Sequence, residues 1–323
     1  MAGSSTRAFV TLDVFTTTPF AGNPLALLPD ATGLSDAQMQ TIAREFNLSE
    51  TIFVFPPADP AHRARVRIFY PQGEMSFAGH PTIGCAIFLA LEDLAPDTDG
   101  ADFDRVLVLE EEAGLVPVRV WREAGEIRAE FQAPVLPECL PDDLPQSAAP
   151  DRCAAALGLG PADLDDAPLA VIAGGPRFAF IGLRDTEALA RAWPVQPAFD
   201  LLQTELAAAG VYLYAPTGAY RWQGRMFDPM GGIPEDPATG SATALFAAQL
   251  LARGALRDGE TCFALQQGVE MGRISDLGLR VICRGGRLAS VHVSGAAVEI
   301  SRGRLRLPPL GPDPRSDRAA RIA

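Results

Sequence analysis

The chain has 323 residues, which favours two domains over one, and its hydrophobic content of 48% is enough for a core in each. The formal net charge of −13 excludes a groove for nucleic acid or a docking surface for anionic lipid, because both need clustered positive charge. Lysine is absent, so Schiff-base chemistry, a pyridoxal-phosphate anchor and a phosphate-loop lysine are excluded as well.

The first half of the sequence predicts a sheet and two helices. Apolar alternation and apolar runs predict strands at 9–15, 25–28, 50–55, 65–70, 105–110, 115–121 and 126–131. One helix follows Ser35, a good N-cap, and continues to about Phe46. The other, over 81–93, is apolar on every face and must therefore be buried on every face. The simplest architecture is a curled sheet wrapped around this central helix.

The second half repeats the plan. Strands are predicted at 169–173, 177–183, 211–215, 221–228, 261–267, 279–284, 287–293 and 296–301, around an apolar helix over 239–253. Pro-rich residues 133–150 fit a linker, and the tail after Leu307 is expected to be frayed. We therefore predict an α+β protein with two pseudo-symmetric lobes, 1–132 and 133–323. The division allows the last strand of the chain to pair with the first lobe.

Two glycine-led segments, Ala78–Thr82 and Glu235–Ala242, lie half a chain apart, each directly before one of the apolar helices. The first N–H groups of a helix have no partner within it, and a glycine there lets an anion approach the backbone. Two such helix starts facing each other would hold a carboxylate or stabilise an enolate-like oxyanion. The spacing therefore predicts one shared site between the lobes.

Three side chains are candidates for carrying a proton in that site. His80 and Asp236 lie at the two helix starts, and Glu50 begins a predicted strand after a loop. A carboxyl group in a closed, mostly apolar site has a raised pKa and can act as an acid and a base. Each residue also has an ordinary structural role as a cap, a turn residue or an exposed side chain. The paired occurrence of the two segments that hold His80 and Asp236, at half-chain spacing, favours catalysis for all three.

The five cysteines form no C-x-x-C pair, and their odd number favours reduced thiols in a cytoplasmic protein. Only three histidines are present and none belongs to an H-E-x-x-H motif, so we expect no zinc site. The first residues show no apolar signal core, and the longest apolar run, 83–91, is too short to span a bilayer.

At these motifs the sequence resembles the PhzF-like family of phenazine biosynthesis, within the diaminopimelate-epimerase fold. The resemblance covers about residues 9–307, and the matching segments are Asp13–Phe15, Phe20–Pro24, Asn47–Thr51, Phe69–Pro71 with Glu74, Ala78–Thr82 and Glu235–Ala242. It implies two lobes of similar fold with the active site between them, a homodimer, and no cofactor. In that family such an enzyme isomerises a dihydro-hydroxyanthranilate by moving a proton across a conjugated ring.

The resemblance also implies roles for individual residues. Glu50 matches the acid/base glutamate, and His80 and Asp236 match its assisting residues. The positions matching substrate-binding residues are Asn23, Gly79, Gly240 and Ser241. Related racemases use two facing cysteines, but Ala78 stands where one thiol would be and Cys85 falls inside the predicted buried helix, so a two-thiol racemase is disfavoured.

Three hypotheses follow for the activity. The preferred one is an isomerase in which Glu50 removes a proton from a small carboxylate-bearing substrate and returns it at another carbon. The first alternative is an epimerase or racemase of an amino or hydroxy acid that uses Glu50 and Asp236 as opposed bases. The second is a non-catalytic protein that binds a metabolite or a partner protein.

Overall fold

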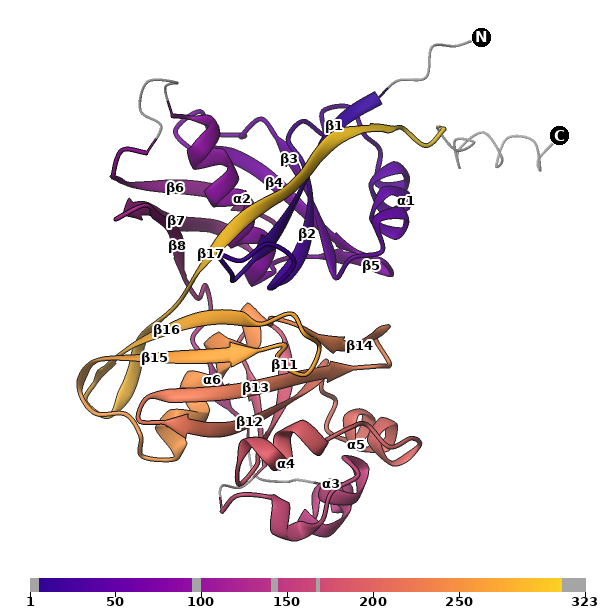
Figure 1. The fold of residues 1–323 in the computed structure, drawn as a ribbon, viewed down its shortest axis with the longest axis vertical. Coiled ribbons are helices and arrows are strands. Elements are labelled where there is room, and N and C mark those ends of the chain that lie inside the picture. Colours follow the sequence, from indigo (N-terminus) through magenta and orange to yellow (C-terminus); the bar gives the residue numbers. More distant parts are fainter. Residues whose placement is uncertain (1–5, 95–99, 141–144, 167–168, 310–323) are drawn as a thin grey trace, which may run out of the picture.

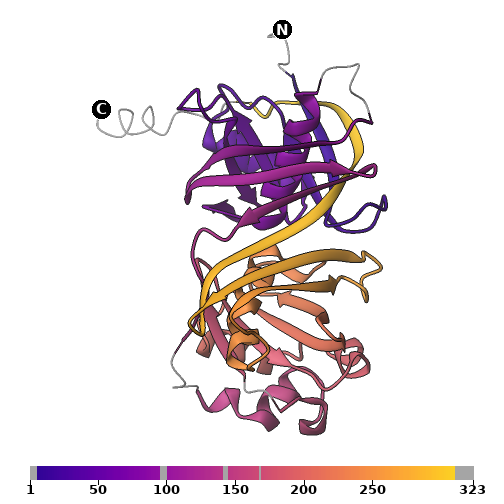
Figure 2. The same cartoon turned by 90° about the vertical axis from the view of Figure 1, so that its left-hand side faces the viewer.

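The computed structural model describes residues 6–94, 100–140, 145–166 and 169–309, which form two bodies joined by a long strand (Figures 1 and 2). Strands and helices contribute to both bodies, so the predicted mixed α+β class is confirmed. None of the helices in these ranges is long and apolar enough to cross a membrane. Most of the tail predicted to fray lies outside the described residues.

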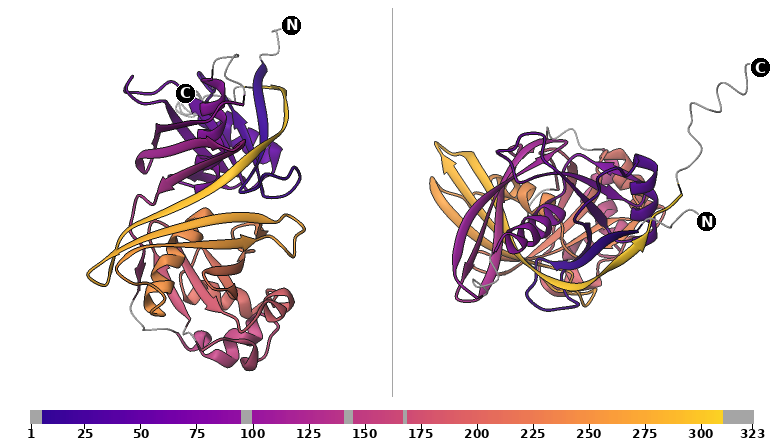
Figure 3. Two further views of the ribbon diagram at one scale, coloured as in Figure 1. Left: turned by 60° about the vertical axis from the view of Figure 1, so that its left-hand side comes forward. Right: turned by 90° about the horizontal axis from the view of Figure 1, so that it is seen from above.

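Eight strands of the first body close into a ring. They are β1 (Thr6–Val14), β2 (Asn23–Leu28), β3 (Glu50–Phe55), β4 (Ala64–Tyr70), β6 (Phe103–Glu111), β7 (Gly114–Glu123), β8 (Glu126–Gln132) and β17 (Arg287–Arg306). Each strand pairs with the next in that order, and β17 pairs back with β1. Helix α2 (Gly79–Glu92) runs inside the ring, as the view from above shows (Figure 3).

The sequence explains where the two helices of this body lie. Residues 79–90 of α2 are all buried, which a helix apolar on every face requires. Helix α1 (Asp36–Phe46) packs outside the ring against β3 and β4. Its Ser35 N-cap forms a capping box with Gln38, and Asn47 ends it in the left-handed conformation, so the predicted helix is confirmed. Strand β5 (Gly73–Met75) pairs with β4.

The second body repeats several connections of the first. Its elements are β9 (Glu138–Cys139), α3 (Pro150–Ala156), β10 (Ala170–Ala173), β11 (Arg177–Gly182), α4 (Thr186–Arg191), α5 (Ala198–Glu205), β12 (Gly210–Gly218), β13 (Arg221–Asp228), β14 (Ile233–Asp236), α6 (Gly240–Ala252), β15 (Gly259–Gln267) and β16 (Ser275–Arg284). Strands β13 and β15 are parallel and flank α6 in sequence, as β4 and β6 flank α2. Strands β11 and β12 are parallel across α4 and α5, as β2 and β3 are across α1.

Several sequence predictions were wrong in detail. The strands predicted at 287–293 and 296–301 are one strand, β17, which pairs with β16 in one body and with β1 in the other. The predicted linker 133–150 contains β9, because Glu138 and Cys139 pair with β10. Helix α2 begins at Gly79 and not at residue 81. The short helices α3, α4 and α5 were not predicted.

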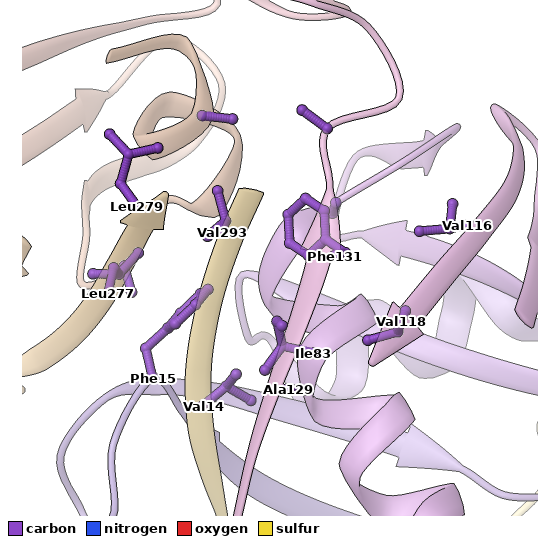
Figure 4. Packing of buried hydrophobic residues seen from close by; sticks show 14 of the residues in the cluster. Val14, Phe15, Ile83, Val116, Val118, Ala129, Phe131, Leu277, Leu279 and Val293 are labelled. Atoms are coloured by element: carbon purple, nitrogen blue, oxygen red, sulfur yellow. The ribbon is translucent and has the colours of Figure 1, made fainter. Parts of the chain in front are cut away.

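Phe15 lies at the junction of the two bodies, beside β17 (Figure 4). Its N–H donates to Ala296 on β17, and its carbonyl accepts from Asp276 on β16. The ring is fully buried, although the backbone adopts φ = 64°, a conformation that bulky residues rarely take. A β-carbon on Gly295 would overlap the Phe15 ring, so this glycine is what lets β17 pass the junction as one strand.

Candidate active site

A cavity of about 490 Å³ lies between the two bodies. Its walls come from Glu50, residues 74–80 and Tyr70 on one side, and from residues 175–178, 226–241 and Ala209 on the other, although not every residue of these ranges lines it. The starts of α2 and α6 both reach this cavity through Gly79 and Gly240. The predicted convergence of the two glycine-led segments is therefore present in the structure.

The two helix starts touch through their glycines. A β-carbon built on Gly79 would lie 3.0 Å from the Cα of Gly240, and one built on Gly240 would lie 3.1 Å from the Cα of Gly79. Aromatic rings flank this contact. Phe131 lies 3.3 Å from the β-carbon built on Gly79, and Phe15 lies 3.3 Å from the one built on Gly240. Only glycine allows the two backbones to approach this closely.

The free N–H groups at the two helix starts differ in number. In α2, Pro81 has no N–H and Thr82 donates to the carbonyl of Ala78, so Gly79 and His80 supply the free donors of the first turn. In α6, Thr243 donates to Thr239, which leaves three backbone donors from Gly240 to Ala242. Among the described residues, the N-cap of neither helix makes a side-chain capping hydrogen bond. An anionic substrate group therefore finds more backbone donors at α6.

Glu50 and His80 form a buried pair on the side of the first body. The carboxyl Oε2 of Glu50, at the start of β3, lies 3.3 Å from His80 Nδ1, and Glu50 is 9% exposed. Burial lowers the pKa of His80 to about 3, so the imidazole is neutral at pH 7. Burial, together with the nearby Asp236 carboxylate, raises the pKa of Glu50 well above its usual range. Glu50 can therefore hold a proton near neutral pH.

Asp236, the last residue of β14, lies on the side of the second body. Its Oδ1 accepts from Asn23 Nδ2 at 2.8 Å and from Ser49 Oγ at 3.2 Å, and its Oδ2 accepts from the Thr239 hydroxyl at 2.5 Å. Burial raises the pKa of Asp236, whereas these three hydrogen bonds act to lower it. The two carboxyl groups thus differ in their partners: Asp236 receives three donors and Glu50 faces the His80 ring.

The structure brings Gly79, Gly240 and Ser241 to the cavity wall, where their predicted binding roles stay predictions. Asn23 is fully buried behind Asp236, and its amide also donates to the carbonyl of Ala238. These contacts favour a supporting role for Asn23 over direct contact with a substrate. Across the described ranges, His, Cys, Asp and Glu do not gather into a group of three that would suit a metal ion.

Three residues of the site were missed from the sequence. Ser49 and Thr239 donate to Asp236, and Gln267 holds the Asp236–Thr239 turn from β15. The available signals were the hydroxyls at positions 49 and 239, which lie inside the matched motifs. For Gln267, the signal was a polar residue at the inward position of an alternating strand. None of these signals identifies a partner without the fold.

The cavity wall as a whole is more apolar than polar. Rings of Tyr70, Phe77 and Phe178 line it, with the carboxylates of Glu74 and Asp228. Glu74 pairs with Arg67, and Asp228 accepts from Gln203. No arginine is among the described residues that line this cavity. Donors for an anionic substrate group are therefore the backbone N–H groups of the helix starts and uncharged side chains such as Ser241 and His80.

The chain matches a family of known proteins over nearly its whole length. The family model described as a phenazine biosynthesis-like protein, PhzC-PhzF, covers residues 12–303. An uncharacterized isomerase of Mesorhizobium japonicum is 41% identical over 93% of this chain and 99% of that protein. A trans-2,3-dihydro-3-hydroxyanthranilate isomerase of Pseudomonas aeruginosa is 36% identical over the same shares.

Solved structures show the same relationship. A protein of Pseudomonas aeruginosa described as a predicted epimerase has a TM-score of 0.78 at 33% identity, over 93% of this chain and 99% of that one. A PhzF-family protein of Bacillus anthracis, 24% identical over the same shares, shares the fold with a TM-score of 0.81. The family resemblance predicted from the sequence is confirmed. The chain belongs to the PhzC-PhzF family of phenazine biosynthesis-like proteins and is an isomerase of that family.

Proposed function

We propose that this protein moves a proton within a small, cyclic, carboxylate-bearing substrate by acid–base catalysis without a cofactor. The observation that carries the proposal is the meeting of Glu50 and Asp236, from opposite bodies, in one buried cavity with a neutral His80. Trans-2,3-dihydro-3-hydroxyanthranilate, named for the Pseudomonas relative, is the substrate to test first.

In the proposed reaction Glu50 takes a proton from one carbon of the substrate. The electron pair of the broken C–H bond passes into the conjugated system, and Glu50 returns the proton at another carbon. The reaction neither gains nor loses electrons, so it needs no oxidant or reductant. The backbone N–H groups at the start of α6 hold the substrate carboxylate, and His80 keeps the Glu50 carboxyl group in place.

The proposal is tested by incubating the protein with trans-2,3-dihydro-3-hydroxyanthranilate in deuterated water. Isomerisation with deuterium at the new carbon position is expected for the wild-type protein, and Glu50→Gln should lower the rate by at least about 100-fold. Glu123→Gln, an exposed change of the same chemistry at the end of β7, is the control. Full turnover by Glu50→Gln would overturn the role of Glu50. If the wild-type protein leaves this compound unchanged, the substrate proposal fails.

The two-base alternative rests on the same pair of carboxyl groups. If Glu50 and Asp236 acted as opposed bases, deuterium would enter at a single carbon with inversion and the double bonds would not move. Nuclear magnetic resonance of the product distinguishes the two outcomes. A protein that only binds a metabolite would exchange no carbon-bound hydrogen at any position.

We also propose the finer organisation that the sequence predicts. The repeated parallel pairs around α2 and α6 support two pseudo-symmetric lobes, with the boundary near residue 132 and β17 returning to the first. The homodimer implied by the family and the cytoplasmic location predicted from the cysteine pattern stay predictions. Analytical ultracentrifugation and cell fractionation test them.

A further inference from the structure

Gln267, the last residue of β15, is fully buried and makes three hydrogen bonds to one turn. Its Nε2 donates to the carbonyl of Asp236 at 2.7 Å and to the hydroxyl of Thr239 at 3.0 Å. Its Oε1 accepts from the Thr239 N–H at 3.1 Å. Because one end of the amide must accept and the other must donate, these partners fix the orientation of the side chain.

This orientation decides where the Thr239 proton points. A hydroxyl group has a single proton, and the Thr239 oxygen already accepts from Gln267. The proton is therefore available for Asp236 Oδ2, 2.5 Å away. With Asn23 and Ser49 on the other oxygen, Asp236 receives three donors. Hydrogen bonds of this kind favour the ionised carboxylate.

Glu50 has no comparable set of donors. Its Oε2 is buried and finds no hydrogen-bond partner of good geometry among the described residues, and the nearest polar group is the His80 ring. The other charged or titratable groups near Asp236 are Glu235, which is paired with Arg225, and the buried phenol of Tyr212. None of them donates to Asp236 in the described contacts, so the difference between the two carboxyl groups comes from the donors Asn23, Ser49 and Thr239, and Gln267 holds the last of these.

We propose that Gln267 is a positioning residue, which directs the Thr239 proton onto Asp236 and so leaves Glu50 as the member of the pair that carries the mobile proton. The inference rests on the proposed acid–base roles of Glu50 and Asp236. It adds that the two carboxyl groups have different roles in the reaction. Asp236, whose pKa is raised by burial to about 6, is the member that is charged at pH 7, and its charge makes Glu50 the stronger base.

The segment that follows Gln267 supports a second donor of Asp236. Arg273 donates to the carbonyls of Ala21 and Gly22 and pairs with Asp13, which lies on β1 of the first body. The next residue after Gly22 is Asn23, whose amide reaches Asp236. One segment of the second body therefore fixes Thr239 at one end and the chain leading to Asn23 at the other.

The test is a pH titration of the two carboxyl groups in the protein without substrate. Carbon-13 labels on the aspartate and glutamate carboxyl carbons report each group, and Asp236→Asn and Glu50→Gln assign the signals. Gln267→Leu removes the three hydrogen bonds at similar volume, and Thr239→Val removes only the hydroxyl. Thr239→Ser restores the hydroxyl. Gln266→Leu, on the exposed face of the same strand, is the matched control.

We expect Asp236 to titrate below Glu50 in the wild-type protein. Gln267→Leu and Thr239→Val should each raise the Asp236 midpoint by about one pH unit, and the double variant should add little to either change. Thr239→Ser and Gln266→Leu should leave it near the wild-type value. The same upward shift should appear in the acid limb of kcat/KM with the dihydro-hydroxyanthranilate.

Two results would overturn the inference: an Asp236 midpoint above that of Glu50 in the wild-type protein, or an unchanged Asp236 midpoint in Thr239→Val. Thr239→Val still tests the inference if Gln267→Leu does not fold. A wild-type protein without turnover would count against the proposed function alone, because the titration needs no substrate.

Discussion

The contact between the two helix starts is the feature whose removal should damage the site most directly. In Gly240→Ala the new β-carbon would lie 3.1 Å from the Cα of Gly79 and 3.3 Å from the ring of Phe15. Carbon atoms that are not bonded prefer separations of about 3.5–4.0 Å. The start of α6 must therefore retreat by a few tenths of an ångström, because the Gly79 neighbour is backbone and cannot rotate away.

That displacement moves the backbone donors of Gly240 and Ser241 relative to Glu50. A misplacement of about 1 Å can cost on the order of 100-fold in rate, so we expect kcat/KM to fall by roughly 10- to 100-fold. Overpacking a buried contact also costs about 1–3 kcal/mol of stability, which corresponds to a fall of a few degrees in Tm. Initial rates with the dihydro-hydroxyanthranilate and thermal unfolding measure the two effects.

Gly218→Ala is the matched control, since its β-carbon would meet nothing closer than Arg221 Cβ at 4.0 Å. Rate and Tm of this variant should stay close to those of the wild-type protein. If Gly240→Ala were as active as Gly218→Ala, the helix starts would be free to separate. Their contact would then not be what sets the geometry of the site.

Three further changes test other parts of the structure. Burial raises the pKa of Glu111 to about 8, so the folded protein holds a proton that the unfolded chain releases. Stability from this group is therefore lost as the pH rises from about 4.5 to 8. The Tm of Glu111→Gln, relative to the Tm of the wild-type protein, should be higher at about pH 8.5 than at about pH 5. Arg225→Leu leaves the buried Glu235 carboxylate without its bidentate partner and should cost about 3–5 kcal/mol in denaturant unfolding. Gly295→Ala places a methyl group within the Phe15 ring and should lower Tm by several degrees. A Gly→Ala change at an exposed strand position is the control, and its Tm should stay close to that of the wild-type protein.

The parts of the fold that the sequence predicted are those with a local cause. Helix α2 is apolar all round because it lies inside a ring of strands, and Ser35 and Asn47 mark the ends of α1 by their own hydrogen bonds and backbone conformation. Strand β17 was predicted as two pieces because a glycine within an alternating run usually marks a break. At Gly295 the glycine instead makes room for Phe15, which lies 280 residues earlier in the chain, and no local pattern reports such a contact.

The candidate site divides in the same way. Gly79 and Gly240 could be predicted because a glycine directly before a buried helix usually marks a close approach to the backbone. Glu50, His80 and Asp236 were candidates from their places at a strand start and at the two helix starts, and the family's motifs implied their roles. The partners of Asp236 could not be predicted, since Asn23 and Ser49 come from the opposite body and Gln267 from a strand beyond α6. The sequence therefore identifies both carboxyl groups, and the family resemblance implies different roles for them, but neither shows the contacts that make their surroundings differ.

The difference between the two carboxyl groups is what bears on the kind of reaction. Two equivalent bases on opposite sides of a substrate suit inversion at one carbon, since one removes a proton and the other supplies a different one. Asp236 is surrounded by donors that favour its charge, whereas Glu50 is buried beside a neutral imidazole and has a raised pKa, so Glu50 can both take up and return a proton. A single proton carrier beside a fixed negative charge suits transfer of one proton between two carbons. The geometry around Asp236 therefore favours isomerisation over epimerisation, independently of the relatives' names.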